Sequence, residues 1–357
     1  MFAGMDTVEL ATKHQTPLYL MDEEKIRAKC RMFRQAMEKY FDCGEILYAS
    51  KAASFVRMYQ IINEENLSAD VVSGGELYTA VHAGFPTERI YFHGNNKSLP
   101  EIEFGIQNRV GYFIVDNLYE LENVNLVGYH CHIGSQVFEH TLFSDSARVM
   151  LQFTEDIKMR LGFEPEVLNL GGGFGVRYVE QDPEPDIDSC LRMVASTVKA
   201  ECANRGLKEP KILLEPGRSI VGDCGITLYT VGSMKEIPGY KKYVAVDGGM
   251  ADNPRYALYQ SKYTAVIANK ANRDKDYTCT VAGKCCESGD VLLENAMIQT
   301  PEPGDILAVL STGAYNYAMS SNYNRIPRPP IVMVSNQRDY VAVRRESFED
   351  LVKNDLR

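Results

Sequence analysis

The stretch from residue 45 to residue 65 reads EILYASKAASFVRMYQIINEE and sets the pattern of the first half of the chain. It begins with a short apolar run that ends at Ser50 and Lys51 and continues with apolar residues at spacings of three and four. A run of the first kind predicts a strand, and a periodic segment of the second kind predicts a helix. The stretch therefore predicts one strand followed by one helix, the repeating unit of a parallel sheet.

The same alternation continues to about Pro216. We predict further strands at 69–73, 89–94, 111–116, 126–134, 167–172 and 211–217, and further helices at 76–82, 142–159 and 191–204. Glycines or polar residues follow several strands, as at Lys51, Gly171 to Gly173 and Glu215 to Arg218. This pattern suits a barrel of parallel strands whose carboxyl-terminal face holds the functional site.

After about Ile220 the chain becomes rich in β-forming segments separated by turn residues, so we predict a second, antiparallel β-domain. The segments are 226–237, 242–249, 263–270, 277–283, 305–311, 329–335 and 340–345. A length of 357 residues also favours two domains over one. We place the barrel domain at 23–222 and the β-domain at 223–357, with residues 1–22 joining the β-domain.

Composition excludes several functional classes. A net charge of -10 argues against a general affinity for nucleic-acid phosphates, and no run of 18 apolar residues occurs. The first twenty residues do not follow the pattern of an export signal, and Cys285 and Cys286 are adjacent among nine cysteines. We therefore expect reduced thiols and a cytoplasmic location. No CxxC pair is present, so no metal site is predicted.

Two features of the first domain suggest a phosphate-bearing carbonyl cofactor. Lys51 follows the end of a predicted strand, where its side chain could enter a pocket and lose contact with water. Desolvation favours the neutral amine that is needed to form a Schiff base. The alternative is an ordinary solvated lysine. The segment LNLGGGFG, residues 168–175, places three glycines after a strand. Their backbone N–H groups could hold a phosphate, or the glycines could form only a tight turn.

Two further motifs could complete that site. In EPGRS, residues 215–219, Arg218 could bind an anionic group and Glu215 a protonated ring nitrogen, unless the two simply pair with each other. In HCHIGSQ, residues 130–136, both histidines share a face of the strand. A two-histidine metal site is conceivable, but His132 stacking on a cofactor ring with Ser135 near its phosphate fits the other motifs better. Packing inside the barrel is the alternative for both histidines.

The second domain adds two candidate motifs. GKCCESGD, residues 283–290, offers a thiol that could donate a proton to a carbanion, whereas a buried structural cysteine pair is the alternative. DNPRYALY, residues 252–259, places Arg255 four residues before Tyr259, a spacing that could present both to one ligand. An exposed arginine and a core tyrosine are the alternative.

These motifs follow one order along the chain, together with YASKA at 48–52, DVVSGGEL at 70–77 and GAYNYAMSSNYN at 313–324. The set resembles the fold-type III pyridoxal-phosphate decarboxylases and matches the diaminopimelate decarboxylase family closely, from about Phe2 to the C-terminus. The resemblance implies an alanine-racemase-like (β/α)8 barrel followed by a β-domain. It also implies pyridoxal 5'-phosphate as cofactor and a head-to-tail homodimer with active sites at the subunit interface.

The resemblance also assigns roles to residues. Lys51 resembles the lysine that carries the cofactor, Cys286 the proton donor from the second subunit, and His132 the residue stacked on the ring. The cofactor contacts that it implies are Asp70, Ser135, Gly172, Gly173, Glu215, Gly217, Arg218 and Tyr315, and the substrate contacts are Arg218, Arg255, Tyr259, Glu287 and Tyr315. The reaction implied is decarboxylation at the D-configured centre of meso-diaminopimelate, which releases L-lysine.

The connector at 116–125 departs from this family pattern. Ten residues separate Val115 from Leu126, whereas a parallel crossover with its helix needs about 10 to 12 residues or more. Family members carry a further strand and helix here, so about one βα unit is absent. Two alternatives stay open: a related decarboxylase of ornithine, lysine, arginine or carboxynorspermidine, and a catalytically inactive homologue. The motifs at 252–259, 285–290 and 313–324 favour a substrate with a distal amino-acid group.

Overall fold

The computed structural model describes residues 1–117, 120 and 125–356, and its chain divides into two compact units. Unit 1 consists of Met1–Ile26, Arg177–Asp182 and Val221–Arg357, and unit 2 of Arg27–Val176 and Pro183–Ile220. The chain therefore starts in unit 1, forms unit 2 with one short return to unit 1 at Arg177–Asp182, and ends in unit 1. None of the helices in the described part of the chain combines the length and apolar character that a membrane span requires.

Unit 2 is built on a seven-stranded sheet in which all neighbouring strands are parallel. The strand order is β5-β4-β3-β2-β8-β7-β6. The strands are β2 (Gly44–Ala49), β3 (Ser68–Val71), β4 (Ile90–Phe92), β5 (Tyr112–Phe113), β6 (Gly128–His130), β7 (Val167–Asn169) and β8 (Lys211–Leu214). All seven strands predicted for this half of the chain are present.

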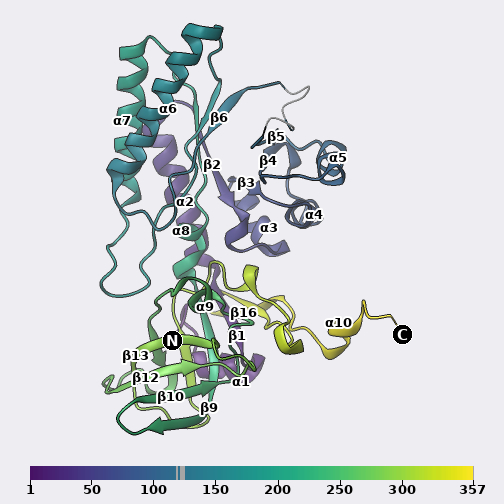
Figure 1. Ribbon diagram of the computed structural model, residues 1–357, viewed down its shortest axis with the longest axis vertical. Helices are drawn as coiled ribbons and strands as arrows, with labels where there is room; N and C mark the ends of the chain where they lie inside the picture. Colours follow the sequence, from purple (N-terminus) through teal and green to yellow (C-terminus); the bar gives the residue numbers. More distant parts are fainter. Residues whose placement is uncertain (118–119, 121–124, 357) are drawn as a thin grey trace. The chain divides into compact units, whose positions relative to one another are not determined.

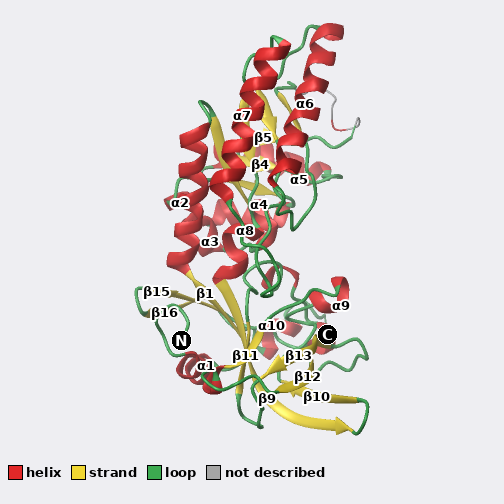
Figure 2. Ribbon diagram, turned by 90° about the vertical axis from the view of Figure 1, so that its left-hand side faces the viewer, coloured by secondary structure: helices red, strands yellow, loops and turns green. Residues whose placement is uncertain are grey.

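Helices alternate with these strands, and those at 56–64, 74–82, 140–161 and 187–205 match the predicted periodic segments. The helices are α2 (Glu23–Tyr40), α3 (Val56–Glu64), α4 (Gly74–His82), α5 (Leu99–Gln107), α6 (His140–Leu161), α7 (Ile187–Arg205) and α8 (Arg218–Val221), with short turns η1 (Ser50–Ala52) and η2 (Thr87–Arg89). Figure 1 shows α6 and α7 side by side, and Figure 2 shows the same pairing from another direction. Helix α6 ends at Gly162 and α7 at Gly206, each in the left-handed conformation that glycine adopts readily.

The parallel sheet of unit 2 is open between its two edge strands. These edges, β5 and β6, are consecutive along the sequence, and no ladder joins them in the described residues. The predicted short connector at 116–125 lies between them, although positions 118–119 and 121–124 are outside the described residues. The architecture is therefore a TIM-like barrel of seven strands that is open at the place where the eighth βα unit was predicted to be missing.

Unit 1 contains a nine-stranded sheet with the main order β13-β12-β10-β9-β1-β15-β16, and β14 pairs with both β9 and β11. The pairs β1–β15 and β10–β12 are parallel, so the sheet is mixed rather than purely antiparallel as predicted. Its strands are β1 (Leu18–Asp22), β9 (Gly225–Ile237), β10 (Lys241–Val246), β11 (Ala265–Ile267), β12 (Tyr277–Ala282), β13 (Val291–Ile298), β14 (Ile306–Val309), β15 (Ile331–Ser335) and β16 (Arg338–Val343).

The core of unit 1 combines the first residues of the chain with its last third. Leu18 and Leu20 on β1 are fully buried and pack with Leu228 of β9 and Val332 of β15. The helices of this unit are α1 (Thr7–His14), α9 (Arg255–Tyr259) and α10 (Phe348–Val352), with turns η4 (Gly222–Cys224), η5 (Ala268–Lys270), η6 (Tyr317–Met319) and η7 (Tyr323–Arg325). The N-terminal strand thus lies inside the second sheet, between β9 and β15.

Candidate active site

Lys51 and Asp70 stand on neighbouring strands of the parallel sheet. Lys51 lies in η1 directly after β2, and Asp70 on β3 pairs in register with Ala49 of β2. Burial raises the pKa of Asp70 to about 7, while the charges of His93 and Lys51 oppose that change. Lys51 itself is exposed, so the burial that we expected to desolvate its amine is not present. The pair nevertheless places an amine and a carboxyl group at one end of the sheet.

The loop after β7 brings backbone very close to neighbouring backbone. A Cβ atom at Gly172 would lie 2.2 Å from the carbonyl oxygen of Glu215, and one at Gly173 would lie 2.6 Å from that of Gly134. Gly173 also has a φ of +105°, which other residues rarely adopt. Both positions therefore require glycine for steric reasons, and the loop leaves room for a close approach of backbone N–H groups to a ligand.

His132 is oriented by that loop. The N–H of Gly172 donates to Nδ1 of His132 over 3.2 Å, so a neutral ring carries its proton on Nε2. Partial burial lowers the pKa of His132, and the nearby charge of Lys51 lowers it further. The structure thus presents a neutral imidazole beside the glycine loop, which is the form suited to stacking on an aromatic cofactor.

Ser135, in the loop after β6, and Arg218, the first residue of α8, come together. Arg218 donates from Nη2 to Oγ of Ser135 over 2.9 Å. Gly217 precedes this arginine, and a Cβ atom there would lie 2.8 Å from the carbonyl oxygen of Ala49. The contact joins two predicted phosphate contacts, and a guanidinium beside a hydroxyl group is a suitable anion site.

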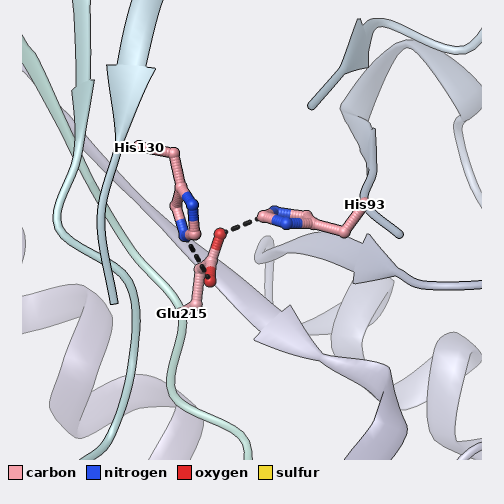
Figure 3. A group of neighbouring side chains, drawn as sticks. All are labelled: His93, His130 and Glu215. Atoms are coloured by element: carbon pink, nitrogen blue, oxygen red, sulfur yellow. Dashed lines mark ion pairs between the residues drawn. The ribbon is translucent and has the colours of Figure 1, made fainter. Parts of the chain in front are cut away.

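Glu215 is buried among polar groups (Figure 3). Its Oε1 accepts from Nδ2 of Asn169 over 2.6 Å and lies 2.8 Å from Nε2 of His93, while Oε2 lies 3.5 Å from Nε2 of His130. Burial alone would raise the pKa of Glu215, but the two imidazoles outweigh it and hold that pKa well below its usual value. The carboxylate is therefore ionised at neutral pH and suited to hold a protonated ring nitrogen.

His93 was not predicted as a site residue. It directly follows β4 and, like Lys51, stands at the carboxyl end of a strand. The segment RIYFHG, residues 89–94, showed this placement, so the rule that identified Lys51 and Glu215 would also have selected His93.

In unit 1, Arg255 lies between two aromatic rings. Its Cζ is 5.5 Å from the ring centroid of Tyr259 and 5.4 Å from that of Tyr315, distances typical of cation–π contacts. Arg255 is buried and Tyr259 is exposed, so the alternative of an exposed arginine with a core tyrosine is wrong. The structure groups three predicted substrate contacts, with Tyr315 in a positive-φ conformation (φ +62°).

The adjacent cysteines of unit 1 differ in environment. Cys285 is buried, and burial raises the pKa of its thiol to about 11. Cys286 is exposed, and its backbone N–H donates to Oδ1 of Asn324 over 2.7 Å. The alternative of a buried cysteine pair is therefore wrong. Glu287 is exposed as well, and the backbone N–H of Gly289 together with nearby hydroxyl groups lowers its pKa.

Comparisons with known proteins cover nearly the whole chain. The family model described as pyridoxal-dependent decarboxylase, pyridoxal binding domain, matches residues 23–125 and 120–222. Diaminopimelate decarboxylase of Bacillus subtilis (strain 168) is 43% identical, and the alignment covers 99% of this chain and 94% of that protein. The chain belongs to the diaminopimelate decarboxylase family.

Solved structures of this family have the same fold. The diaminopimelate decarboxylase of M. jannaschii, in complex with L-lysine, superposes with a TM-score of 0.92 at 29% identity, covering 99% of this chain and 95% of that one. The enzyme of Helicobacter pylori, also complexed with L-lysine, superposes with a TM-score of 0.86 at 26% identity and 98% coverage of both chains.

The comparisons also show that relatives are longer than this chain. The alignment with the Bacillus subtilis family member spans 413 positions, whereas this chain has 357 residues, so at least 56 positions of that relative lack a counterpart. The family model matches in two parts that meet at 120–125. This junction lies between β5 and β6, the open edges of the sheet.

Proposed function

We propose that this chain binds pyridoxal 5'-phosphate and decarboxylates meso-2,6-diaminopimelate to L-lysine and CO2, a step of lysine biosynthesis. The observation that carries the proposal is the match to a diaminopimelate decarboxylase at 43% identity over 94% of that relative's length. The substrate-contact motifs at 252–259 and 285–290 lie within the aligned length.

The residues present fit the cofactor. The crowded glycines at 172 and 173 form a cradle that a side chain would fill, and the Arg218–Ser135 contact provides an anion site for a phosphate group. The ionised, buried Glu215 suits a protonated pyridine nitrogen. When bound, pyridoxal phosphate supplies an electron sink for the carbanion left by decarboxylation. Lys51 would hold the cofactor and His132 would stack on its ring.

The remaining roles belong to unit 1. Cys286 is exposed and can donate a proton to the substrate Cα after CO2 has left. Arg255, held between the rings of Tyr259 and Tyr315, and the ionised Glu287 offer opposite charges for the distal amino-acid group of the substrate. A substrate that ends in a bare amine would leave the guanidinium of Arg255 without an anionic partner.

We also propose a cytoplasmic homodimer with active sites shared between subunits, with 23–222 as the cofactor domain and 223–357 plus 1–22 as the second domain. The nine cysteines are all free, which is typical of a reducing compartment. The resemblance to the fold-type III decarboxylases supports the shared site, in which the partner subunit's Cys286 would serve the Lys51 of the first.

A turnover comparison tests the proposed activity. The purified chain, supplied with pyridoxal phosphate, should release L-lysine from meso-diaminopimelate and show much lower turnover with L-ornithine, L-lysine or L-arginine. Lys51→Ala should remove both the turnover and the visible absorbance of bound cofactor, whereas Lys199→Ala, at an exposed surface lysine, should keep both. Cofactor absorbance without release of CO2 from any of these substrates would instead identify an inactive homologue.

The absent βα unit needs its own measurement. Intact mass spectrometry should give 40.1 kDa if the protein has the sequence described here. A mass larger by the equivalent of about 56 residues would show that the working enzyme contains the additional unit found in its relatives.

A further inference from the structure

Three side chains from separate strand ends of unit 2 converge on one point (Figure 3). His93 follows β4, His130 ends β6 and Glu215 follows β8. Their nitrogen and oxygen atoms all lie within 4.8 Å of one another, with Nε2 of His93 2.8 Å from Oε1 of Glu215 and Nε2 of His130 3.5 Å from Oε2. Each residue therefore offers one ligand atom to a common centre.

A fourth group lies beside this centre. Asp70 is 1% exposed, and its Oδ1 lies 3.8 Å from Nε2 of His93. Among the described residues, this oxygen and the Nε2 atoms of His93 and His130 have no partner with hydrogen-bond geometry. Buried polar atoms normally have such a partner, and each exception needs a cause. The two imidazole nitrogens and the Asp70 oxygen that have no such partner, beside the ionised carboxylate of Glu215, make up the donor set of a bound cation.

The chemistry of the donors selects the kind of cation. Imidazole nitrogen with carboxylate oxygen suits zinc and neighbouring transition metals, whereas calcium and magnesium prefer oxygen alone. Zinc bound tetrahedrally at about 2.0–2.1 Å needs ligand atoms roughly 3.3 Å apart. The distances from the imidazole nitrogens of His93 and His130 to the carboxylate oxygens of Glu215 are 2.8 Å and 3.5 Å, on either side of that spacing. Small side-chain rotations would therefore be enough to bring these atoms into the geometry of a zinc site.

We propose that His93, His130 and Glu215, with Asp70 as the adjacent fourth group, bind one divalent transition-metal ion of the zinc class when the cofactor is absent. Metal and cofactor then exclude each other, because Glu215 cannot ligate a metal and hold the pyridine nitrogen together. The exclusion rests on the proposed function, whereas metal binding does not.

Metal binding can be measured on the full chain after dialysis against a chelator and without pyridoxal phosphate. Addition of Co²⁺ should give visible absorbance that saturates at one ion per chain, and Zn²⁺ should displace it. His93→Gln, His130→Gln and Glu215→Gln should each weaken Co²⁺ binding at least about 100-fold, since each removes a direct ligand. His132→Ala changes a nearby histidine outside the cluster and should leave metal affinity within about threefold of that of the unchanged chain.

Prior loading with pyridoxal phosphate should abolish Co²⁺ uptake, as measured by absorbance and by metal content after gel filtration. Circular dichroism shows whether each variant is folded. Only folded variants are compared, and at least one of the three glutamine variants must be folded for the comparison. The absence of stoichiometric binding, or binding that the folded variants leave unchanged, would overturn the site. Equal uptake with and without bound cofactor would overturn the exclusion. Failure of cofactor to bind would contradict the proposed function, while the metal titration would still decide the metal site.

Discussion

Cys285 and Cys286 are adjacent in the sequence, yet only one has a thiol available for chemistry. Cys286 is exposed, whereas burial raises the pKa of Cys285 to about 11 and keeps it protonated and inaccessible. The sequence identifies the motif but does not show which of its two cysteines is exposed. That difference depends on the local fold. This residue-level difference leads to a prediction about which thiol matters.

Cys286→Ala should lower turnover of meso-diaminopimelate by about 10² to 10⁴, the usual contribution of a positioned proton donor, and should leave cofactor absorbance intact. Cys285→Ala is the matched control and should reduce turnover only mildly, because it removes a small buried side chain. Steady-state kinetics and cofactor titration of both variants test this prediction. A larger loss of turnover in Cys285→Ala would reverse the assignment within the motif.

Asp252 in unit 1 makes stability depend on pH. It is buried, accepts from the Tyr229 hydroxyl over 2.5 Å, and burial raises its pKa from the ordinary value of 3.8 to about 7. The folded state holds the proton of Asp252 more tightly than the unfolded state does. The stability that this proton contributes is therefore complete below about pH 4 and is lost as pH rises to about 7. At 1.36 kcal/mol per pKa unit, the loss amounts to up to about 4 kcal/mol.

Asp252→Asn should remove that loss, because the amide does not titrate. The free energy of unfolding of both proteins can be measured with urea between pH 4 and pH 8. As pH rises to 7, the value for the unchanged chain should fall relative to that of the variant. Above pH 7 the difference between the two should stay constant. Asp274→Asn, at an exposed position, controls for the loss of one carboxylate. Parallel curves for the unchanged chain and Asp252→Asn would contradict the prediction.

At the level of elements, apolar patterning was sufficient for most strands and for the helices α3, α4, α6 and α7. All seven strands of the parallel sheet were predicted, because each is a short apolar run bounded by polar residues or glycines. Helix α2 was not predicted, although Ile26, Cys30, Phe33 and Met37 are buried at spacings of three and four. These spacings are typical of an amphipathic helix, so no physical feature of the segment conceals it.

Strand β13 was also not predicted, for a physical reason. Its register against β12 shifts between Cys279 and Val281, so Glu294 and Asn295 together oppose Thr280. Such a bulge inserts one extra residue and breaks the alternation of apolar and polar positions on which strand prediction relies. Similarly, the sequence could not show that His93 and Glu215 meet, because β4 and β8 are not neighbours in the sheet and only the folded structure brings these two side chains together.

The glycine loop after β7 carries a prediction of its own. Gly173→Ala should weaken cofactor binding by about tenfold or more, because its positive φ costs roughly 1–2 kcal/mol and the added Cβ meets the Gly134 carbonyl oxygen. Gly162 also has a positive φ, of +67°, but a Cβ atom there would meet nothing within 4 Å, so Gly162→Ala should lower stability without changing cofactor affinity. Titration with pyridoxal phosphate and thermal unfolding separate the two effects, and equal affinities would refute the loop's role.

For the whole molecule, the open sheet is the main departure from the family. The edge strands β5 and β6 hold only two and three residues, and at least 56 aligned positions of the Bacillus subtilis relative lack a counterpart in this chain. The strands that carry Lys51, Asp70, His130 and Glu215 are nevertheless present and paired with their neighbours. The loss therefore affects closure of the barrel more than the set of functional side chains.

The proposed shared site makes the last prediction. If Lys51 of one subunit works with the partner subunit's Cys286, each single variant is strongly impaired as a homodimer, but a mixed dimer has one site with both residues intact. Random reassortment of Lys51→Ala and Cys286→Ala subunits makes half of the dimers mixed, and half of the sites in each mixed dimer are complete, so activity should approach about a quarter of that of the unchanged enzyme. Differently tagged subunits purified through both tags would demonstrate exchange. If subunits exchange and activity stays at the level of the single variants, the site must be built within one chain. In that case no mixed dimer contains a site in which both residues are intact.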